Sequence, residues 1–222
     1  MVRSSSVNAP TPAVVPGRED LQPLLEALKS IAAALKADGV PFALAGSYAA
    51  YARGGARSLN DVDFVVPEDA LPAAVSTLQR RGFRVEHPPE DWLVKAYVDD
   101  LLVDIIHTLA NGPVDAEMLA RADELGVESV LMPVLSATDL MVAKLRAMWE
   151  HSCDLEPVLA LARSLREQID FAEVDAACDG FPYAEAGLLL LRRLDVVPDD
   201  GTQPAEVDVT APAQPRQKEE AP

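Results

Sequence analysis

The stretch LAGSYAAYARGGARSLNDVDFVV, Leu44 to Val66, decides the expected fold of the first half of the chain. Its apolar run breaks at Gly46-Ser47 and passes into a segment of small residues that favours a short helix. After a loop, Asp61 to Val66 has the alternating pattern of a strand. The order strand, tight turn, helix, loop, strand therefore predicts an α/β unit.

This unit carries a pair of carboxylates, and one later strand carries a third. On a strand, Asp61 and Asp63 point to the same face about 7 Å apart along the chain. At about 6 Å and an effective dielectric of about 20, their repulsion is roughly 3 kcal/mol, which favours a cation between them. A third acid, Asp104, lies inside the apolar run LLVDIIHT, where a buried carboxylate needs an ion partner or a metal. If the two strands are neighbours, the three carboxylates form the oxygen-rich set that Mg²⁺ prefers. An acidic chain also contains Asp-x-Asp by chance, and such a pair is commonly only solvated.

The Gly46-Ser47 step is a candidate site for an anion. A turn into a helix N-terminus directs free backbone N–H groups and the positive end of the helix dipole toward an anion, and glycine lets the anion approach closely. The simpler alternative is a tight strand-to-helix turn without a ligand.

Composition restricts the partners of the protein. The 222 residues include 19 Lys and Arg against 36 Asp and Glu, which gives a formal charge of −17. Attraction to phosphate backbones or anionic membranes is then a poor default, although a local basic patch remains compatible with this charge. No apolar stretch approaches the roughly 18 to 20 residues of a membrane-spanning helix, and residues 1–17 have no signal-like apolar core, so a cytoplasmic protein is expected.

Four segments follow from the patterning. Residues 1–17 and the acidic, proline-rich residues 198–222 are predicted to be disordered tails, residues 18–110 an α/β core, and residues 111–197 a helical region. A ligand cleft is expected between the core and the helical region. The expected helices are Leu21–Leu35, Tyr48–Arg53, Glu68–Arg81, Leu135–Trp149, Asp154–Leu165, Phe171–Cys178 and Tyr183–Leu194. The expected strands are Phe42–Ala45, Asp61–Val66, Phe83–Glu86, Leu93–Val98 and Leu101–Thr108, with one β-like insertion at Glu128–Met132.

Taken in order, these motifs resemble the nucleotidyltransferase superfamily that includes DNA polymerase β. The resemblance covers about residues 40 to 108 and implies a mixed sheet flanked by helices. It implies that Gly46 and Ser47 hold a nucleoside triphosphate and that Asp61 and Asp63 bind two Mg²⁺ ions. In the same family the third acid, here Asp104, helps to bind the metal that activates the attacking hydroxyl.

Basic and hydroxyl side chains flank the Gly54-Gly55 loop. Arg57 and Ser58 stand directly before the paired acids, and Arg57 is the preferred candidate to neutralise triphosphate oxygens. Arg53, on the other side of the loop, is the second candidate.

A later stretch, LSATDLMVAKLRAMWEHSCDLEPVLAL, looks like the helical motif of AbiE-type and MenT-type nucleotidyltransferase toxins. The resemblance implies that Lys144 contacts the nucleotide phosphates and that Asp154 supports catalysis. The chain departs from the motif at His151 and Cys153, where an arginine often precedes the final aspartate. A snorkelling lysine at the edge of an apolar helix face is the alternative for Lys144.

These resemblances imply an enzyme that transfers a nucleoside monophosphate from an NTP, such as ATP, to an acceptor hydroxyl and releases pyrophosphate. The toxin resemblance implies a tRNA acceptor and leaves room for an antitoxin or other protein partner. Transfer to an aminoglycoside-like small molecule or to a protein hydroxyl, and an inactive nucleotide- or partner-binding protein, are the alternatives. A tRNA acceptor requires basic residues to cluster in space, and the candidates are Lys29, Lys36, Arg80, Arg81, Arg84, Lys95, Lys144 and Arg146.

Overall fold

A computed structural model describes residues 18–56 and 61–197 of the chain. The expectations for the two tails, and those for Arg57 and Ser58, lie outside the described residues.

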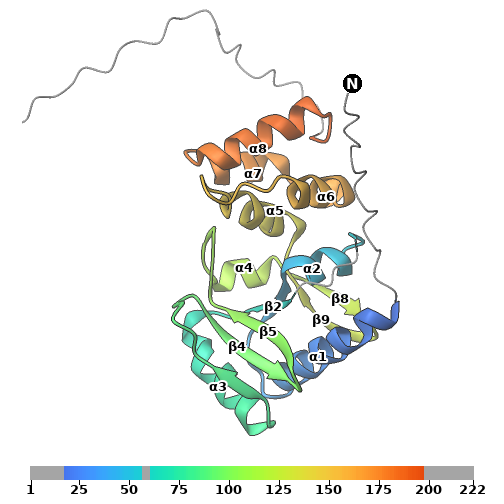
Figure 1. The fold of residues 1–222 in the computed structure, drawn as a ribbon, viewed down its shortest axis with the longest axis vertical. Coiled ribbons are helices and arrows are strands. Elements are labelled where there is room, and N and C mark those ends of the chain that lie inside the picture. Colours follow the sequence, from blue (N-terminus) through green and yellow to red (C-terminus); the bar gives the residue numbers. More distant parts are fainter. Residues whose placement is uncertain (1–17, 57–60, 198–222) are drawn as a thin grey trace, which may run out of the picture.

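The described chain is built around a seven-stranded mixed sheet with the strand order β3-β4-β5-β2-β1-β9-β8 (Figure 1). The β2–β5 and β1–β9 pairs are parallel, and the other neighbouring strands are antiparallel. The strands are β1 (Ala43–Ala45), β2 (Val62–Val65), β3 (Arg84–Glu86), β4 (Leu93–Val98), β5 (Leu101–Ile106), β8 (Asp123–Val127) and β9 (Val130–Val134). This mixed α/β sheet confirms the predicted fold class.

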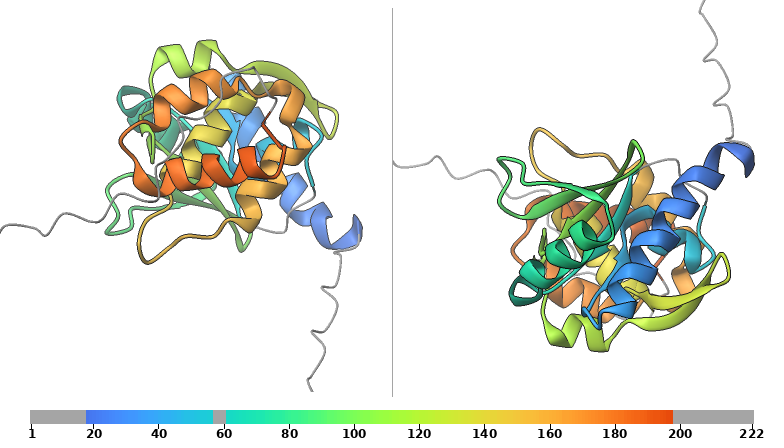
Figure 2. Two further views of the ribbon diagram at one scale, coloured as in Figure 1. Left: turned by 90° about the horizontal axis from the view of Figure 1, so that it is seen from above. Right: turned by 90° about the horizontal axis from the view of Figure 1, so that it is seen from below.

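Helices lie on both sides of the sheet. Helices α1 (Arg18–Ala37) and α3 (Leu71–Arg80) lie together on the side away from the C-terminal helices, as the view from below shows (Figure 2). Helix α2 (Gly46–Ala52) follows β1 directly. The helical annex, defined as α5 (Ala137–Arg146), α6 (Glu156–Ser164), α7 (Phe171–Cys178) and α8 (Pro182–Arg193), stands beyond α2 (Figure 1). The short elements are η1 (Glu68–Ala70), β6 (Thr108–Leu109), β7 (Gly112–Pro113), α4 (Ala116–Ala120) and η2 (Arg166–Gln168).

The core joins these layers through apolar side chains. Leu28, Ile31 and Leu35 of α1 are fully buried, as the 3.6-residue spacing of that helix predicts. Phe42 and Phe64 meet edge to face at a centroid distance of 5.7 Å. No helix in the described part of the chain is long and apolar enough to cross a membrane.

The sheet extends further along the chain than the pattern indicated. Within residues 111–197 only the stretch Glu128–Met132 was expected to be β-like, whereas β8 and β9 form a hairpin there and β9 pairs with β1. The reason is that β8 reads DELGV and lies at the edge of the sheet, mostly exposed, so it lacks the apolar alternation of a half-buried strand.

Two boundaries near the acids also differ from the expectation. Asp61 precedes β2 instead of opening it, and β5 ends at Ile106 instead of Thr108. After Ile106 the chain enters a small β6–β7 hairpin, in which the backbone of Val114 returns to hydrogen-bond His107.

Candidate active site

Strand register brings two of the predicted acids together. In the parallel β2–β5 pair Asp63 lies opposite Asp104, and in the β1–β2 pair it lies opposite Ala45. Neighbouring strands are about 4.8 Å apart and paired residues share a face, so the two carboxylates are direct neighbours. The predicted adjacency of the Asp63 and Asp104 strands is therefore present.

The carboxylate of Asp63 rests on the backbone of Gly46. A Cβ atom added at Gly46 would lie 1.8 Å from Asp63 Oδ2, so no larger residue fits without moving the acid. Gly46 also has a φ of +59°, a conformation that side-chain-bearing residues rarely adopt. The glycine of the Gly-Ser step thus serves both the turn and the placement of the acid.

The first turn of α2 carries polar atoms without partners. The hydroxyl groups of Ser47 and Tyr48 are buried and have no hydrogen-bond partner among the described residues. Buried polar groups are nearly always satisfied, and an unsatisfied one requires an explanation such as a ligand. Ser47 lines the cavity described below, which makes it available to a bound group.

Burial and mutual repulsion raise the pKa of both acids. Burial, together with the negative charges of Asp104 and Asp61, raises the pKa of Asp63 to about 7, and Lys144 opposes the shift. Burial also raises the pKa of Asp104, against the influence of the neighbouring Lys95. A carboxylate with such a raised pKa has too little positive charge around it, which is the condition that a bound cation relieves.

A cavity of about 400 Å³ lies between the sheet and the annex. On the core side it is lined by Gly46, Ser47 and Asp63, and on the annex side by Lys144. The remaining annex wall is mostly apolar, with side chains from α5, from its C-cap and from α6 that include Leu140, Ala143, Ala147, Ala160 and Leu161, and Ser164 is its polar member. The predicted cleft between core and helical region is present.

The other predicted site residues lie in different surroundings. Asp61 is exposed just before β2, close enough for its charge to raise the pKa of Asp63. Asp154 is exposed ahead of α6, where its Oδ1 accepts a hydrogen bond from the backbone N–H of Glu156 at 3.0 Å. Asp154 is not among the cavity-lining residues, and Arg57 and Ser58 fall outside the described part of the chain.

The donor set is compatible with a hard cation. Asp63 and Asp104 offer carboxylate oxygens, and Ser47, which lines the cavity with Asp63, offers a hydroxyl oxygen; these are ligands that Mg²⁺ prefers, although the Lys95 ammonium also lies beside Asp104. Within residues 18–56 and 61–197, no three His, Cys, Asp or Glu side chains are arranged as a finished metal site. The paired acids and the unpartnered Ser47 hydroxyl fit a cation, while the three-carboxylate site stays a prediction.

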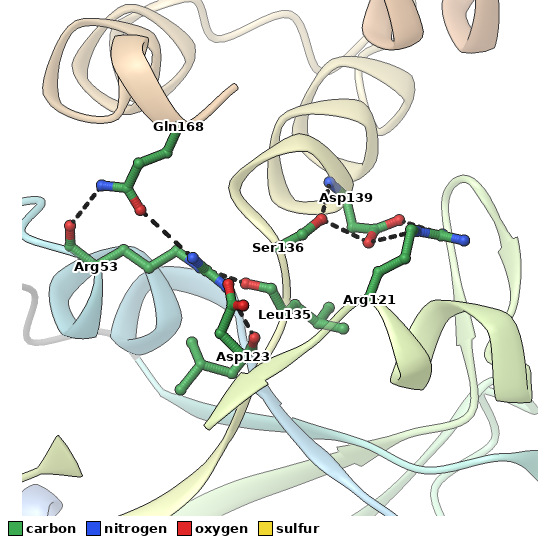
Figure 3. A network of polar contacts seen from close by, with 8 residues as sticks. Arg53, Arg121, Asp123, Leu135, Ser136, Asp139 and Gln168 are labelled. Atoms are coloured by element: carbon green, nitrogen blue, oxygen red, sulfur yellow. Dashed lines mark hydrogen bonds and ion pairs between the residues drawn. The ribbon is translucent and has the colours of Figure 1, made fainter. Parts of the chain in front are cut away.

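Arg53 was a candidate phosphate ligand, and the structure corrects this assignment. Its side chain is only 6% exposed, and it donates to the carbonyl oxygens of Leu135 and Val134 and to the carboxylate of Asp123 (Figure 3). Its own carbonyl accepts a hydrogen bond from the Gln168 amide at 2.9 Å. Arg53 therefore joins the end of α2 to β8, β9 and the annex, and its guanidinium is occupied.

A second cluster in Figure 3 fixes the start of the helix that carries Lys144. The Ser136 hydroxyl accepts from the backbone N–H of Asp139 at 2.9 Å, and it donates to the buried carboxylate of Asp139. Arg121 pairs with the same carboxylate at 2.6 Å. An N-cap of this kind, backed by a charge pair, holds the first turn of α5 in place.

One charged neighbour of the acids was not recognised as a site residue from the sequence. Lys95 of β4 lies opposite Asp104, and its Nζ is 3.5 Å from Asp104 Oδ1. The signal was present, because a two-residue turn at Asp99-Asp100 between β4 and β5 imposes this pairing, and Asp99 has the positive φ of 54° that such turns use.

Comparison with known proteins identifies the family. A family model described as uncharacterised nucleotidyltransferase matches residues 18–191. The solution structure of the antibiotic-resistance factor ANT(2'')-Ia is similar over 78% of this chain and 98% of that chain, with 16% identity and a TM-score of 0.56. At this identity the likeness shows the fold.

Two further structures are less similar. The lincomycin-bound lincosamide antibiotic adenylyltransferase LnuA matches over 68% of this chain and 96% of its own, with 13% identity and a TM-score of 0.43. A tRNA nucleotidyltransferase complexed with a primer tRNA and an incoming ATP analogue matches over 78% of this chain and 63% of its own, with 16% identity and a TM-score of 0.32. A search of curated proteins gives no match. The resemblance to AbiE-type and MenT-type toxins stays a prediction. The family match covers most of the chain, so the protein belongs to the nucleotidyltransferases and is an NTP-using transferase.

Proposed function

We propose that the protein transfers a nucleoside monophosphate from an NTP to the hydroxyl of a small acceptor, with Asp61, Asp63 and Asp104 holding two Mg²⁺ ions. The observation that carries the proposal is the position of Asp63. It is paired in register with Asp104, rests on the backbone of Gly46 and faces the same cavity as Lys144.

The residues of the chain divide the work of the reaction. The acceptor oxygen forms a bond to the α-phosphorus, the bond to the bridging oxygen breaks, and pyrophosphate leaves. Gly46 and Ser47 present backbone N–H groups to the triphosphate, and Lys144 neutralises its charge. Asp104, which is paired in register with Asp63, would receive the proton of the hydroxyl. Bound Mg²⁺ would add Lewis-acid charge and acidify the attacking hydroxyl.

Three residues named by the sequence complete the proposal without a described contact to the cavity. Arg57 and Ser58 would face triphosphate oxygens, as the family resemblance implies. Asp154 would support catalysis through the position of α6, because its carboxylate accepts a hydrogen bond from the backbone N–H of Glu156, the first residue of that helix.

Charge distribution favours a small acceptor over tRNA. Of the eight basic residues considered for a tRNA surface, five form ion pairs with acids outside the proposed site: Lys29, Lys36, Arg80, Arg81 and Arg84. Lys95 lies beside Asp104 of the proposed site, where it can contact one phosphate but forms no extended basic surface. Arg80 and Arg81, at the end of α3, share Asp38, which follows α1. Helices α1 and α3 lie on the side of the molecule away from the annex (Figure 2). Paired and dispersed cations attract a polyanion weakly, particularly on a chain of net charge −17. A tRNA acceptor, with an antitoxin partner, and a protein hydroxyl are the competing outcomes of the test.

The test uses labelled nucleotides and three acceptor pools. Each α-labelled NTP is incubated with the protein, Mg²⁺ and total tRNA, soluble protein or a panel of small hydroxyl compounds. We expect label in the small-molecule pool, and a loss of about 10³-fold in Asp63→Asn because the charge that positions the reacting phosphate is gone. The control Asp69→Asn makes the same chemical change at an exposed position of η1. NTP binding without pyrophosphate release from any pool would instead support the inactive binding protein.

A further inference from the structure

A row of charged residues crosses the sheet in register. Glu86 of β3 pairs with Lys95 of β4, Lys95 pairs with Asp104 of β5, and Asp104 pairs with Asp63 of β2. Residues paired in this way share one face of a sheet. The row of charged residues therefore runs from Asp63 and Asp104 to Lys95 on the same face of the sheet.

The ammonium group of Lys95 has more hydrogen-bond donors than its contact with Asp104 uses. Its Nζ lies 3.5 Å from Asp104 Oδ1, and its side chain is 29% exposed against 13% for Asp104. An ammonium carries three N–H donors, and the contact with Asp104 is the one that Nζ makes within the described part of the chain. The side chain is partly exposed, so its remaining N–H groups are accessible to a ligand beside Asp104, the proposed acceptor of the hydroxyl proton.

Glu86, the next acid in the row, forms its contacts with residues other than Lys95. Glu86 is paired with the Arg84 guanidinium and accepts a hydrogen bond from the Tyr97 hydroxyl at 3.2 Å. Arg84 also stacks over the Tyr97 ring, 3.6 Å from its centroid. Because Glu86 is satisfied by these two neighbours, the charge of Lys95 is balanced by Asp104 alone.

The row of paired residues places Lys95 on the side of Asp63 from which we expect the acceptor substrate to approach. The cavity is lined by Gly46 and Ser47 and reaches Ile106 at the end of β5, whereas Asp104 and Lys95 are not among its lining residues and follow Asp63 along the row toward β4. In an in-line transfer the attacking hydroxyl approaches opposite the leaving pyrophosphate. If the triphosphate occupies the cavity, the acceptor approaches across Asp104 and meets Lys95.

We propose that Lys95 is a specificity-determining residue that selects acceptors carrying an anionic group, a phosphate or a carboxylate, next to the reactive hydroxyl. This inference rests on the proposed nucleotidyl transfer. An ammonium group at this place attracts such an anion and disfavours a cationic group at the same position, so an anionic acceptor is preferred over an aminoglycoside-type acceptor. A phosphate of this kind is supplied by a small phosphorylated compound or by the last nucleotide of an RNA.

The test compares acceptors that differ only in a phosphate. Glycerol is compared with glycerol 3-phosphate, and adenosine with adenosine 5′-monophosphate, while kanamycin serves as the polycation and a short oligoribonucleotide ending in CCA as the RNA. The measured quantity is the ratio of kcat/KM between the two members of each pair. The variants are Lys95→Met, which keeps the aliphatic stem, and Lys95→Arg, which keeps the charge, with Lys29→Met on α1 as a lysine control.

We expect the wild type, Lys95→Arg and Lys29→Met to prefer the phosphorylated partner by about 10-fold or more, the scale of one charge-assisted hydrogen bond. In Lys95→Met the ratio should fall toward one, with an unchanged KM for NTP. If Lys95 had a purely structural role, Lys95→Met would lower kcat/KM equally for both acceptors of a pair and leave their ratio unaltered. That result, or kanamycin as the best acceptor of the wild type, would overturn the inference. Preference for the oligonucleotide alone would identify RNA as the source of the phosphate.

A binding measurement tests the anion subsite independently of nucleotidyl transfer. Glycerol 3-phosphate and glycerol are titrated by calorimetry into the protein saturated with a non-hydrolysable NTP analogue and Mg²⁺. Tighter binding of glycerol 3-phosphate to the wild type than to Lys95→Met, by about 10-fold, supports the anion subsite even when no pyrophosphate is released. Equal binding of glycerol 3-phosphate by both proteins rejects the subsite even when transfer to another acceptor is active.

Discussion

The sheet core and the helical annex contribute different things to one cavity. In the core, charged groups are positioned by backbone pairing: Asp63 and Asp104 by the β2–β5 ladder, and Lys95 by the β4–β5 ladder. The annex supplies one cation, Lys144, on a wall of mostly apolar side chains. The comparison teaches that the core fixes the chemistry and the annex fixes the shape and charge of the space in which the nucleotide binds.

A single buried arginine couples the two regions. Arg53 follows the end of α2 and reaches the carbonyl oxygens at the junction of β9 and α5, while Gln168 of η2, which connects α6 and α7 of the annex, donates a hydrogen bond to its backbone carbonyl. Because β9 also pairs with β1, the strand before Gly46 and the helix that carries Lys144 share one rigid connection. Variants in the core should therefore affect turnover, and variants in the annex should affect binding.

The largest expected effect tests the core through stability. The pKa of Asp63 is about 7 in the folded protein, against about 3.9 for an unfolded aspartate. Between pH 4 and 7 the folded state binds more protons, so the free energy of unfolding falls as pH rises, by roughly 4 kcal/mol in total. Asp63→Asn has no such charge. It should match the wild type near pH 4 and be more stable at pH 8 in urea denaturation without metal.

Adding Mg²⁺ to the urea denaturation tests whether the ionised carboxylate of Asp63 binds a cation. At pH 8 a cation that binds the ionised acid should raise the midpoint of wild-type unfolding and leave that of Asp63→Asn nearly unchanged. The exposed control Asp69→Asn should differ from the wild type by less than about 0.5 kcal/mol at either pH. A stability gain of Asp63→Asn that is equal at pH 4 and pH 8 would contradict the raised pKa.

The second prediction concerns the contact between Gly46 and Asp63. Gly46→Ala places a methyl group where the carboxylate lies and should reduce kcat by about 10²-fold, because small displacements of reacting groups cost that much. Gly39→Ala is the matched control, since Gly39 has a similar φ of +68° and open space around its Cα. Both variants should lose about 1–2 kcal/mol of stability from the left-handed backbone, but only Gly46→Ala should lose activity. Equal activity of the two would remove Gly46 from the site.

The smallest expected effect tests the annex. Lys144→Ala should raise the KM for NTP by about 10-fold, the value of one charge-assisted contact, with a smaller change in kcat. Lys144 is exposed on α5, so thermal unfolding should stay nearly unchanged. Arg163→Ala removes an exposed cation from the neighbouring helix α6 and should leave the KM unaltered. Unchanged nucleotide kinetics in Lys144→Ala would return the lysine to the role of a surface cation.

Local patterns allowed much of the fold to be predicted. The Gly46 turn, the helices α1 and α7 and the strand β4 follow from periodicity within a few consecutive residues, and β4 and α7 have the predicted bounds. Strand β8 did not follow, because an exposed edge strand carries no apolar alternation. Arg53 was misjudged because a basic residue near a glycine loop looks the same in sequence whether its guanidinium is free or, as here, occupied by buried carbonyl oxygens.

The sequence by itself determined which chemical groups are available: a Gly-Ser turn, paired aspartates, a third acid in an apolar strand and a lysine on an amphipathic helix. These are local properties, because turn geometry and side-chain periodicity depend on neighbouring residues. The tertiary structure decided which groups meet. Pairing of Asp63 with Asp104, contact of Lys95 with Asp104 and placement of Lys144 across the cavity depend on strand register and helix packing. Hydrogen-bond ladders and core packing between distant segments fix these, and no local propensity encodes them.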